Sequence, residues 1–288
     1  MAFRTVVVSS HCKLEYSLNY LVYKTIDEIK RINLDEIHTL IIESSMVTIT
    51  TSLMIELINK KIKVIFCDEK KNPQSELMPY YGDSISTGRI QEQIAWTQDI
   101  KDLIWKEIIK EKIKNQAYVM GFVNNEVSNQ ILEFKNQVED GDVTNREGHA
   151  AKVYFNNVFG QGFSRNSNHP NNIYLNYGYA ILLSQFNKAI IAKGYLTQVG
   201  IHHKNANNPF NFSCDLMEPF RPIVDKKTLT LNEKNYKDEL IGLLNLMVEI
   251  GGQKQTLSNA INIYCASIFR ALNTGSVNEI KFFTSYEL

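Results

Sequence analysis

The sequence is poor in cysteine and proline, has no excess of charge of either sign, and contains no long hydrophobic run. Its 4 Cys residues are too few and too widely spaced for a disulfide framework or a Cys-x-x-Cys metal site. Lys+Arg and Asp+Glu both number 31, which excludes a histone-like basic coat and an acidic tail. The longest unbroken apolar run, residues 179–183, is far short of the roughly 20 residues that span a bilayer. The sequence therefore predicts a soluble, cytoplasmic protein.

Several common catalytic motifs are also missing. The chain has no Gly-x-Gly-x-x-Gly after a predicted strand, no P-loop and no His-Glu-x-x-His, so dinucleotide-binding, P-loop NTPase and zincin functions lack their motif. The Gly-x-Ser-x-Gly nucleophile elbow is absent too, which weakens a serine-hydrolase assignment. Any active site must therefore be built from side chains scattered along the chain.

The hydrophobic pattern divides the chain into two parts. Short β-branched or alternating runs at residues 5–8, 13–16, 20–23, 40–42 and 63–67 predict strands, and residues 50–59 predict one helix among them. Turn-forming residues then cluster up to Gly88, and from Arg89 the apolar spacing is helical. We predict an α+β protein: a β-rich domain at residues 1–75, a linker at 76–88 and a larger all-α domain at 89–288.

The predicted helical part begins with a long helix that carries both tryptophans. Trp96 and Trp105 are expected on opposite sides of this helix, which covers residues 89–122, and core burial is favoured for both over stacking on nucleobases. Further helices are predicted at residues 145–159, 172–193, 214–229, 236–250 and 257–272.

Three short polar segments of the helical part contain the candidate functional residues. In the first, Thr144 and Glu147 fit a capping box at the start of a helix. Two neighbours fit that structural role poorly, because Arg146 places a cation where the helix dipole prefers an anion and Gly148 weakens the helix. We therefore keep both a capping role and a functional role for Glu147.

The other two segments supply histidines and a second pair of acids. His202 and His203 lie in an Asn-rich loop, where a solvent-facing role is the common one. Asp215 and Glu218 follow Ser213, a candidate helix N-cap, and are three residues apart, so they are expected on one helical face. Glu218 has apolar neighbours, and a carboxylate in such a setting needs a compensating cation.

Together the segments offer Glu147, His203 and Glu218 as a mixed oxygen and nitrogen ligand set. Two carboxylates and an imidazole suit Mg²⁺ or Mn²⁺, with water and phosphate completing the coordination, and would also suit Zn²⁺ in a hydrolase. Nearby cations favour a phosphate-bearing substrate, because positive charge stabilises a phosphoryl group in transfer. The candidate phosphate or DNA contacts are Arg146, Lys204 and Arg221, each of which would equally suit an ion pair or a solvated surface.

Residues 145–149, 200–203 and 215–222 resemble the motifs of the CRISPR spacer-acquisition integrases, the first of the CRISPR-associated protein families, in the form found in type II systems. The similarity extends to residues 3–8, 64–68 and 89–96. It implies a small β domain that mediates dimerisation and a larger helical catalytic domain. It also implies that Glu147, His203 and Glu218 are the catalytic metal ligands, while Asp215 supports the site without binding the ion.

The resemblance further implies an activity and a set of partners. The expected reaction is attack by the 3′-hydroxyl of a captured DNA fragment on a phosphodiester of a CRISPR repeat, assisted by Mg²⁺ or Mn²⁺, with endonuclease activity when water is the nucleophile. Expected partners are DNA, a second copy of the chain and a bridging dimer of the second CRISPR-associated protein. In type II systems an accessory ring protein and the RNA-guided effector nuclease join them.

Two alternatives remain from the residues alone. A zinc-dependent phosphohydrolase would keep Zn²⁺ through purification and act without DNA. A catalytically inactive DNA-binding scaffold would use the three residues for capping and ion pairing, so that replacing them would affect folding alone. Divalent-metal-dependent DNA strand transfer separates the integrase from both.

Overall fold

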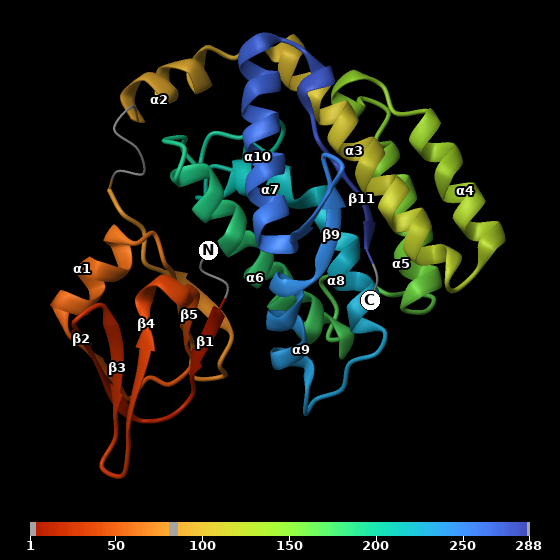
Figure 1. Cartoon of the computed structure of the whole chain (residues 1–288). Helices are drawn as coiled ribbons and strands as arrows, with labels where there is room; N and C mark the ends of the chain where they lie inside the picture. Colours follow the sequence, from red (N-terminus) through yellow and green to blue (C-terminus); the bar gives the residue numbers. More distant parts are fainter. Residues whose placement is uncertain (1–3, 81–85, 287–288) are drawn as a thin grey trace. The chain divides into compact units, whose positions relative to one another are not determined.

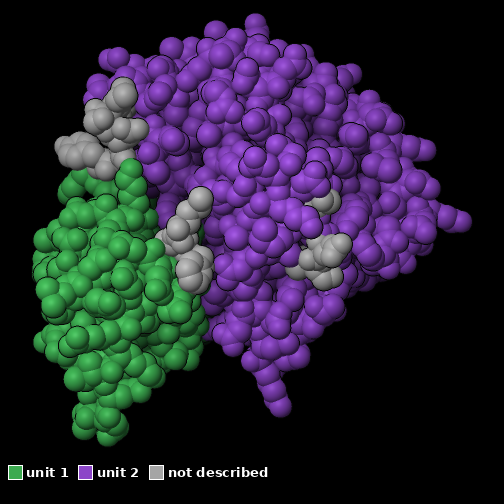
Figure 2. Space-filling model, viewed as in Figure 1, with its two compact units in different colours: residues 1–82 green, residues 83–288 purple. Residues whose placement is uncertain are grey.

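The computed structural model describes residues 4–80 and 86–286, and these form two compact units, residues 1–82 and 83–288 (Figures 1 and 2). The division between the units falls inside the linker predicted at residues 76–88. Part of that linker, residues 81–85, lies outside the described residues. Its last part already belongs to a helix, because α2 starts at Ser86.

The described residues of the first unit form two four-stranded sheets, one α-helix and the short 3₁₀ helix η1 Leu34–Glu36. One sheet has the order β1-β5-β7-β8, with β1, β5 and β7 parallel and β8 antiparallel to β7; the other has the order β4-β3-β2-β6. Leucines of both sheets and of helix α1 pack into a shared core. The bounds are β1 Arg4–Val8, β2 Cys12–Ser17, β3 Tyr20–Lys24, β4 Ile29–Asn33, β5 Ile37–Ile42, β6 Val47–Ile49, α1 Thr51–Asn59, β7 Lys63–Cys67 and β8 Pro73–Glu76.

The five strands and the helix predicted for this unit are confirmed, and β4, β6 and β8 were missed. The hydrophobic pattern does not reveal strand β4, because its residues are largely exposed. This exposure agrees with its place at the edge of the sheet. Strand β8 begins with a proline, which a sheet accepts at the start of an edge strand.

The second unit is mainly helical and is organised around α3. This helix packs against α4, α5, α8, α10 and the short 3₁₀ helix η3, and Figure 1 shows α4 and α5 beside it. The helices are α2 Ser86–Ala95, α3 Gln98–Gly121, α4 Asn125–Asn136, η2 Asp140–Asp142, α5 Arg146–Val158, α6 Asn171–Ile191, α7 Asn211–Met217, η3 Glu218–Phe220, α8 Arg221–Thr228, α9 Tyr236–Gly242, η4 Leu243–Asn245, α10 Leu257–Thr274 and η5 Val277–Glu279.

The prediction of an all-helical domain missed a three-stranded sheet of order β10-β9-β11 near the C-terminus, formed by β9 Met247–Ile250, β10 Gln253–Thr256 and β11 Phe283–Tyr286. The helix predicted at residues 236–250 therefore ends early, and its second half includes β9. The class itself, a strand-rich N-terminal part followed by a helical part, is confirmed.

Two other predicted helices are interrupted. The helix at residues 89–122 breaks after Ala95, where Thr97 caps α3, so the two tryptophans do not share one helix. Both are nonetheless buried, Trp96 at 7% and Trp105 at 1% exposure. The helix at residues 214–229 is divided into α7, η3 and α8, since a proline removes a backbone donor in each of the last two. Among the described residues, none of the helices is long and apolar enough to cross a membrane.

Candidate functional site: an acid, histidine and lysine centre

Glu147 is held at the start of α5 by a cap that differs from the predicted one. Asn145 is the N-cap: it adopts left-handed backbone geometry (φ 51°) and its side chain accepts a hydrogen bond from the Gly148 amide at 3.2 Å. The Asp142 carboxylate accepts from the amides of Arg146 and Glu147 at 2.8 and 3.0 Å. The capping-box prediction was wrong, since the helix begins one residue later than a Thr144 cap requires. The Glu147 carboxylate is thereby left available for other contacts.

Gly148 lies directly against the side chain that caps α5. A Cβ at this position would lie 2.7 Å from Oδ1 of Asn145, closer than real contacts allow. Glycine therefore makes room for the Asn145 side chain.

Glu218 reaches the site from η3, between two short helices. The backbone carbonyl of Pro219 accepts a hydrogen bond of 2.9 Å from the buried side chain of Asn115 on α3, which ties η3 to that helix. Glu218 is only 4% exposed, and its Oε1 accepts from Nε of Arg221 at 2.8 Å. Oε2 accepts no hydrogen bond from the described part of the chain, although it lies within ion-pair distance of a lysine.

That lysine, Lys112 of α3, joins the two acids. Its Nζ lies 2.5 Å from Oε1 of Glu147 and 2.5 Å from Oε2 of Glu218. Lys112 is 7% exposed. Burial alone would lower the pKa of this ammonium, but the two carboxylates outweigh burial and raise it. The two predicted acids therefore converge on one buried cation.

The electrostatic environment keeps Glu218 ionised. Burial by itself would raise the pKa of its carboxyl group, yet the charges of Arg221 and Lys112 prevail and lower the pKa to about 2. Arg221 responds in the opposite direction: despite its burial, the Glu218 charge raises its pKa. A buried carboxylate that stays charged at neutral pH is suited to holding a cation.

His203 is fixed in the loop between α6 and α7 by Asp215. Nδ1 of His203 lies 2.5 Å from Oδ1 of Asp215, whose carboxylate also accepts from the backbone amides of Ile201, His202 and His203 at 2.7, 3.0 and 3.1 Å. Asp215 is fully buried. If Nδ1 donates its proton to Asp215, the lone pair of Nε2 is free to bind an ion or accept a proton.

The same loop requires glycine at its start. A Cβ on Gly200 would lie 2.6 Å from Oδ2 of Asp215 and 2.7 Å from the backbone oxygen of His203. Only a residue without a side chain lets the loop approach the carboxylate this closely. The Ser213 cap was predicted wrongly, because α7 begins at Asn211 and Ser213 is internal.

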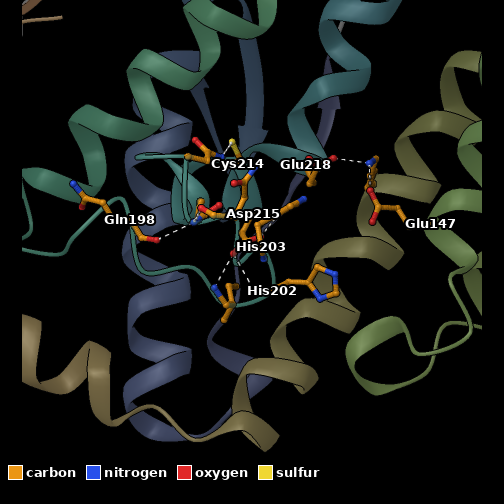
Figure 3. Close-up of polar contacts among 12 residues, drawn as sticks. Glu147, Gln198, His202, His203, Cys214, Asp215 and Glu218 are labelled. Atoms are coloured by element: carbon orange, nitrogen blue, oxygen red, sulfur yellow. Dashed lines mark hydrogen bonds and ion pairs between the residues drawn. The ribbon is translucent and has the colours of Figure 1, made fainter. Parts of the chain in front are cut away.

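The two adjacent histidines have different environments. The His202 ring stacks flat on the buried ring of Trp105, with centroids 4.2 Å apart and an interplanar angle of 3°. The hydrogen bond to Asp215 raises the pKa of His203 most strongly, and Glu218 and Glu147 add to the effect. The acids are thus close enough to His203 to influence its charge, which favours His203 over His202 as the functional imidazole (Figure 3).

The three residues predicted to contact DNA differ in their contacts within the protein. Arg221 pairs with Glu218, and its guanidinium lies over the Tyr179 ring at 4.7 Å. Lys204 is exposed and lies with Lys101 along a pocket of about 720 Å³ that reaches His203. Arg146 lines a second pocket of about 610 Å³ along α5, together with Lys152. DNA contact by these residues remains a prediction.

The residue types predicted as ligands suit a hard divalent cation by their chemistry. Within the described ranges, no three His, Cys, Asp or Glu side chains lie close enough together to hold a metal ion as they stand. The Lys112 ammonium lies between the two carboxylates, and one oxygen of Glu218 lacks a hydrogen bond. Two carboxylates and an oriented imidazole are suitable ligands for Mg²⁺ or Mn²⁺. The assignment of Glu147, His203 and Glu218 as ligands stays a prediction.

Sequence reasoning missed Lys112 altogether. The signal was present, because Lys112 lies three, four and seven positions after Ile109, Ile108 and Trp105, all of which are buried. A lysine on the apolar stripe of a helix needs a buried anion as partner, and Glu147 and Glu218 supply it.

Comparisons with known proteins show which family the chain is similar to. The chain is 28% identical over 291 residues to a CRISPR-associated endonuclease Cas1 of Neisseria meningitidis, covering 98% of this chain and 96% of the relative. Among solved structures it resembles a casposase bound to its integration product (TM-score 0.78, 20% identity, 96% and 92% of the two chains). It also resembles a Cas1 protein of Thermotoga maritima (TM-score 0.77, 16% identity, 99% and 100%).

A larger assembly contains the same fold. A Cas6-RT-Cas1–Cas2 complex matches with a TM-score of 0.75 at 16% identity, over 96% of this chain and 36% of the longer one. The family model described as "CRISPR associated protein Cas1" matches residues 5–240, which includes all three predicted ligands. The chain therefore belongs to the Cas1 family of CRISPR-associated proteins.

Proposed function

We propose that this chain is a Mg²⁺- or Mn²⁺-dependent DNA integrase that inserts captured fragments into a CRISPR array. The observation that carries the proposal is the meeting of Glu147 and Glu218, from separate elements, on one buried cation beside an imidazole held by Asp215. Family membership adds the CRISPR context. The structural neighbour described as a casposase bound to its integration product supports integration rather than small-molecule hydrolysis.

The reaction is a transesterification. The 3′-hydroxyl of the incoming strand loses its proton as its oxygen forms a bond to the phosphorus of a repeat phosphodiester. The bond from that phosphorus to the target strand's 3′-oxygen breaks, and the departing oxygen gains a proton. A divalent ion held by Glu147, His203 and Glu218 would supply Lewis acidity to the phosphoryl oxygens. Water in place of the 3′-hydroxyl gives the endonuclease reaction.

The chain's own residues orient and charge the site. Asp215 fixes the His203 ring and its tautomer, so that Nε2 faces away from the carboxylate. Arg221 holds Glu218 ionised and brings positive charge to where the phosphoryl group gains negative charge. Lys204 and Arg146 line two separate pockets, which suits a reaction that must hold two DNA strands.

The proposed partners follow the same reasoning. A chain of zero net charge needs basic strips aligned by assembly to hold DNA, and a homodimer bridged by the second CRISPR-associated protein provides this. The Cas1–Cas2 complex among the structural neighbours supports that partner. Participation of the type II ring protein and of the effector nuclease is proposed on resemblance alone.

The test is strand transfer. A labelled duplex with free 3′ ends is incubated with a supercoiled plasmid that carries repeats, the second CRISPR-associated protein and MnCl₂, and covalent joining is measured. We expect joining by the wild type, its loss with EDTA, and at least a 100-fold loss in His203→Ala. The matched control is His202→Ala, which removes a neighbouring ring that does not bond to Asp215 and should lose less than 10-fold.

Failure has two distinguishable forms. Hydrolysis of a small phosphorylated molecule with Zn²⁺ and without DNA would favour the phosphohydrolase. DNA binding with no joining under any metal, and circular dichroism showing a folded protein, would favour the inactive scaffold.

A further inference from the structure

Lys112 is the unusual feature of the site, because a buried ammonium lies between the two acids that are predicted to hold a metal ion. Its Nζ is equally close to Glu147 and Glu218, at 2.5 Å from an oxygen of each. A divalent ion bound by the same two oxygens would lie next to this ammonium. Like charges at such a separation repel strongly in a buried setting.

The charges around the two carboxylates are balanced. Glu147 and Glu218 carry two negative charges, and Lys112 and Arg221, in contact with them, carry two positive charges. The Asp215 carboxylate is engaged separately by His203 and by three backbone amides. A divalent ion added to this group would therefore bring an excess of two positive charges.

We propose that Lys112 acts as a tethered competitor for the metal ion, so that divalent-cation binding becomes tight only when a DNA phosphate is present to balance the charge. The inference rests on the proposed function, because it takes Glu147 and Glu218 as ligands. Lys112 is a positioning residue in this scheme: it holds the carboxylates together without the ion and yields to it. The phosphate of the substrate then receives the released ammonium as a partner.

The position of Lys112 on its helix supports displacement rather than permanent pairing. Lys112 reaches the acids from α3, while Glu147 belongs to α5 and Glu218 to η3, so the ammonium is on a flexible stem of its own and can move without disturbing either acid. Arg221 is different, because it follows Glu218 by three residues and its guanidinium is held over the Tyr179 ring. Of the two cations, Lys112 is the one free to leave.

The test measures Mn²⁺ binding without DNA, by electron paramagnetic resonance of free Mn²⁺ in titrations of the full chain. We expect Lys112→Met and Lys112→Gln to bind Mn²⁺ at least 10-fold more tightly than the wild type. Lys112→Arg keeps the charge and should stay within threefold. Lys114→Met is the matched control, since Lys114 is a half-buried neighbour on the same helix that pairs with Glu111.

The second measurement is the coupling between metal and DNA. Coupling between two ligands is reciprocal, so DNA that tightens Mn²⁺ binding must itself bind more tightly with Mn²⁺. A DNA fragment should tighten Mn²⁺ binding to the wild type at least 10-fold and tighten it less in Lys112→Met.

Equal or weaker Mn²⁺ binding by both neutral variants would overturn the inference and show that the ammonium prepares the site for the ion. If Lys112→Met folds poorly, the melting temperature is measured with and without Mn²⁺ in place of the titration. Mn²⁺ must raise the melting temperature of the variant by more than it raises that of the wild type. A smaller rise would also overturn the inference. Because these measurements follow metal binding, their failure is separate from a failure of wild-type strand transfer, which would reject the proposed function.

Discussion

The imidazole of His203 and the fully buried carboxylate of Asp215 are 2.5 Å apart, and the same carboxylate closes the loop by accepting from three consecutive backbone amides. One side chain thus sets both the path of the loop and the orientation of the histidine. Changes at Asp215 should therefore act through His203, although Asp215 itself is not assigned as a ligand.

Asp215→Asn should lower strand transfer 10- to 100-fold, the range found when groups that orient a metal ligand are replaced. It should also lower the His203 pKa, because the hydrogen bond to Asp215 is the largest cause of its rise. Nuclear magnetic resonance titration of the ring measures the pKa. In a His203→Ala background the Asp215→Asn change should cost little further activity; an additive loss would show that Asp215 acts independently of the imidazole.

Gly200→Ala should disable the loop. Its Cβ would meet Oδ2 of Asp215 and the His203 carbonyl at 2.6 and 2.7 Å, so the loop must shift, with a loss of about 1–3 kcal/mol in unfolding free energy. Gly242→Ala is the matched control, because a Cβ there has no neighbour within 4 Å among the described residues. Urea denaturation of both variants checks this, and similar stabilities would contradict the close approach.

Glu218→Gln and Glu147→Gln should differ in stability but not in activity. Glu218 is nearly buried and balances Lys112 and Arg221, so its neutralisation leaves buried charge uncompensated and should cost about 3 kcal/mol. The Glu147 side chain is 25% exposed and should cost less than half as much. Both should abolish strand transfer. Thermal and urea unfolding measure the stability of both variants. Equal destabilisation by Glu218→Gln and Glu147→Gln would contradict the claim that Glu218 is the main partner of the buried cations.

Asp225→Asn should flatten the pH dependence of stability. Burial, opposed in part by the hydroxyls of Tyr179 and Tyr154, raises the Asp225 pKa from 3.8 to about 6. A raised carboxyl pKa means that the folded state holds the proton more tightly, so this contribution is complete below pH 3.8 and is lost as pH rises through about 6. The lost contribution is up to about 3 kcal/mol.

The measurement is the urea unfolding free energy of both proteins between pH 4 and 7. Other titrating groups are common to the two, so the difference isolates Asp225. Asparagine cannot ionise, and the variant should gain stability relative to the wild type as pH rises. Parallel curves would show that Asp225 is not protonated preferentially in the fold.

Local patterns were sufficient for strands β1, β2, β3, β5 and β7 of the first unit and for the start of α5 to within a residue. They failed where tertiary contacts decide the outcome: Asn145 caps α5 in place of Thr144 because the Asp142 carboxylate takes the next two amides. The short sheet formed by β9, β10 and β11 has too few residues to show periodicity.

For the candidate site, the resemblance supplied Glu147, His203 and Glu218, and the structure adds how they are held. No periodicity could reveal that Lys112 joins acids from two other elements, since that contact depends on how α3, α5 and η3 pack. The pairing of Asp215 with His203 likewise depends on the turn that Gly200 permits.

Anomalous diffraction from crystals soaked in MnCl₂ tests the central claim most directly. The account predicts one strong manganese peak at coordination distance, about 2.1 Å for hard octahedral cations, from oxygens of Glu147 and Glu218 and from a ring nitrogen of His203, with the Lys112 ammonium moved away. A map in which Lys112 still joins both acids and manganese binds elsewhere, or not at all, would contradict it.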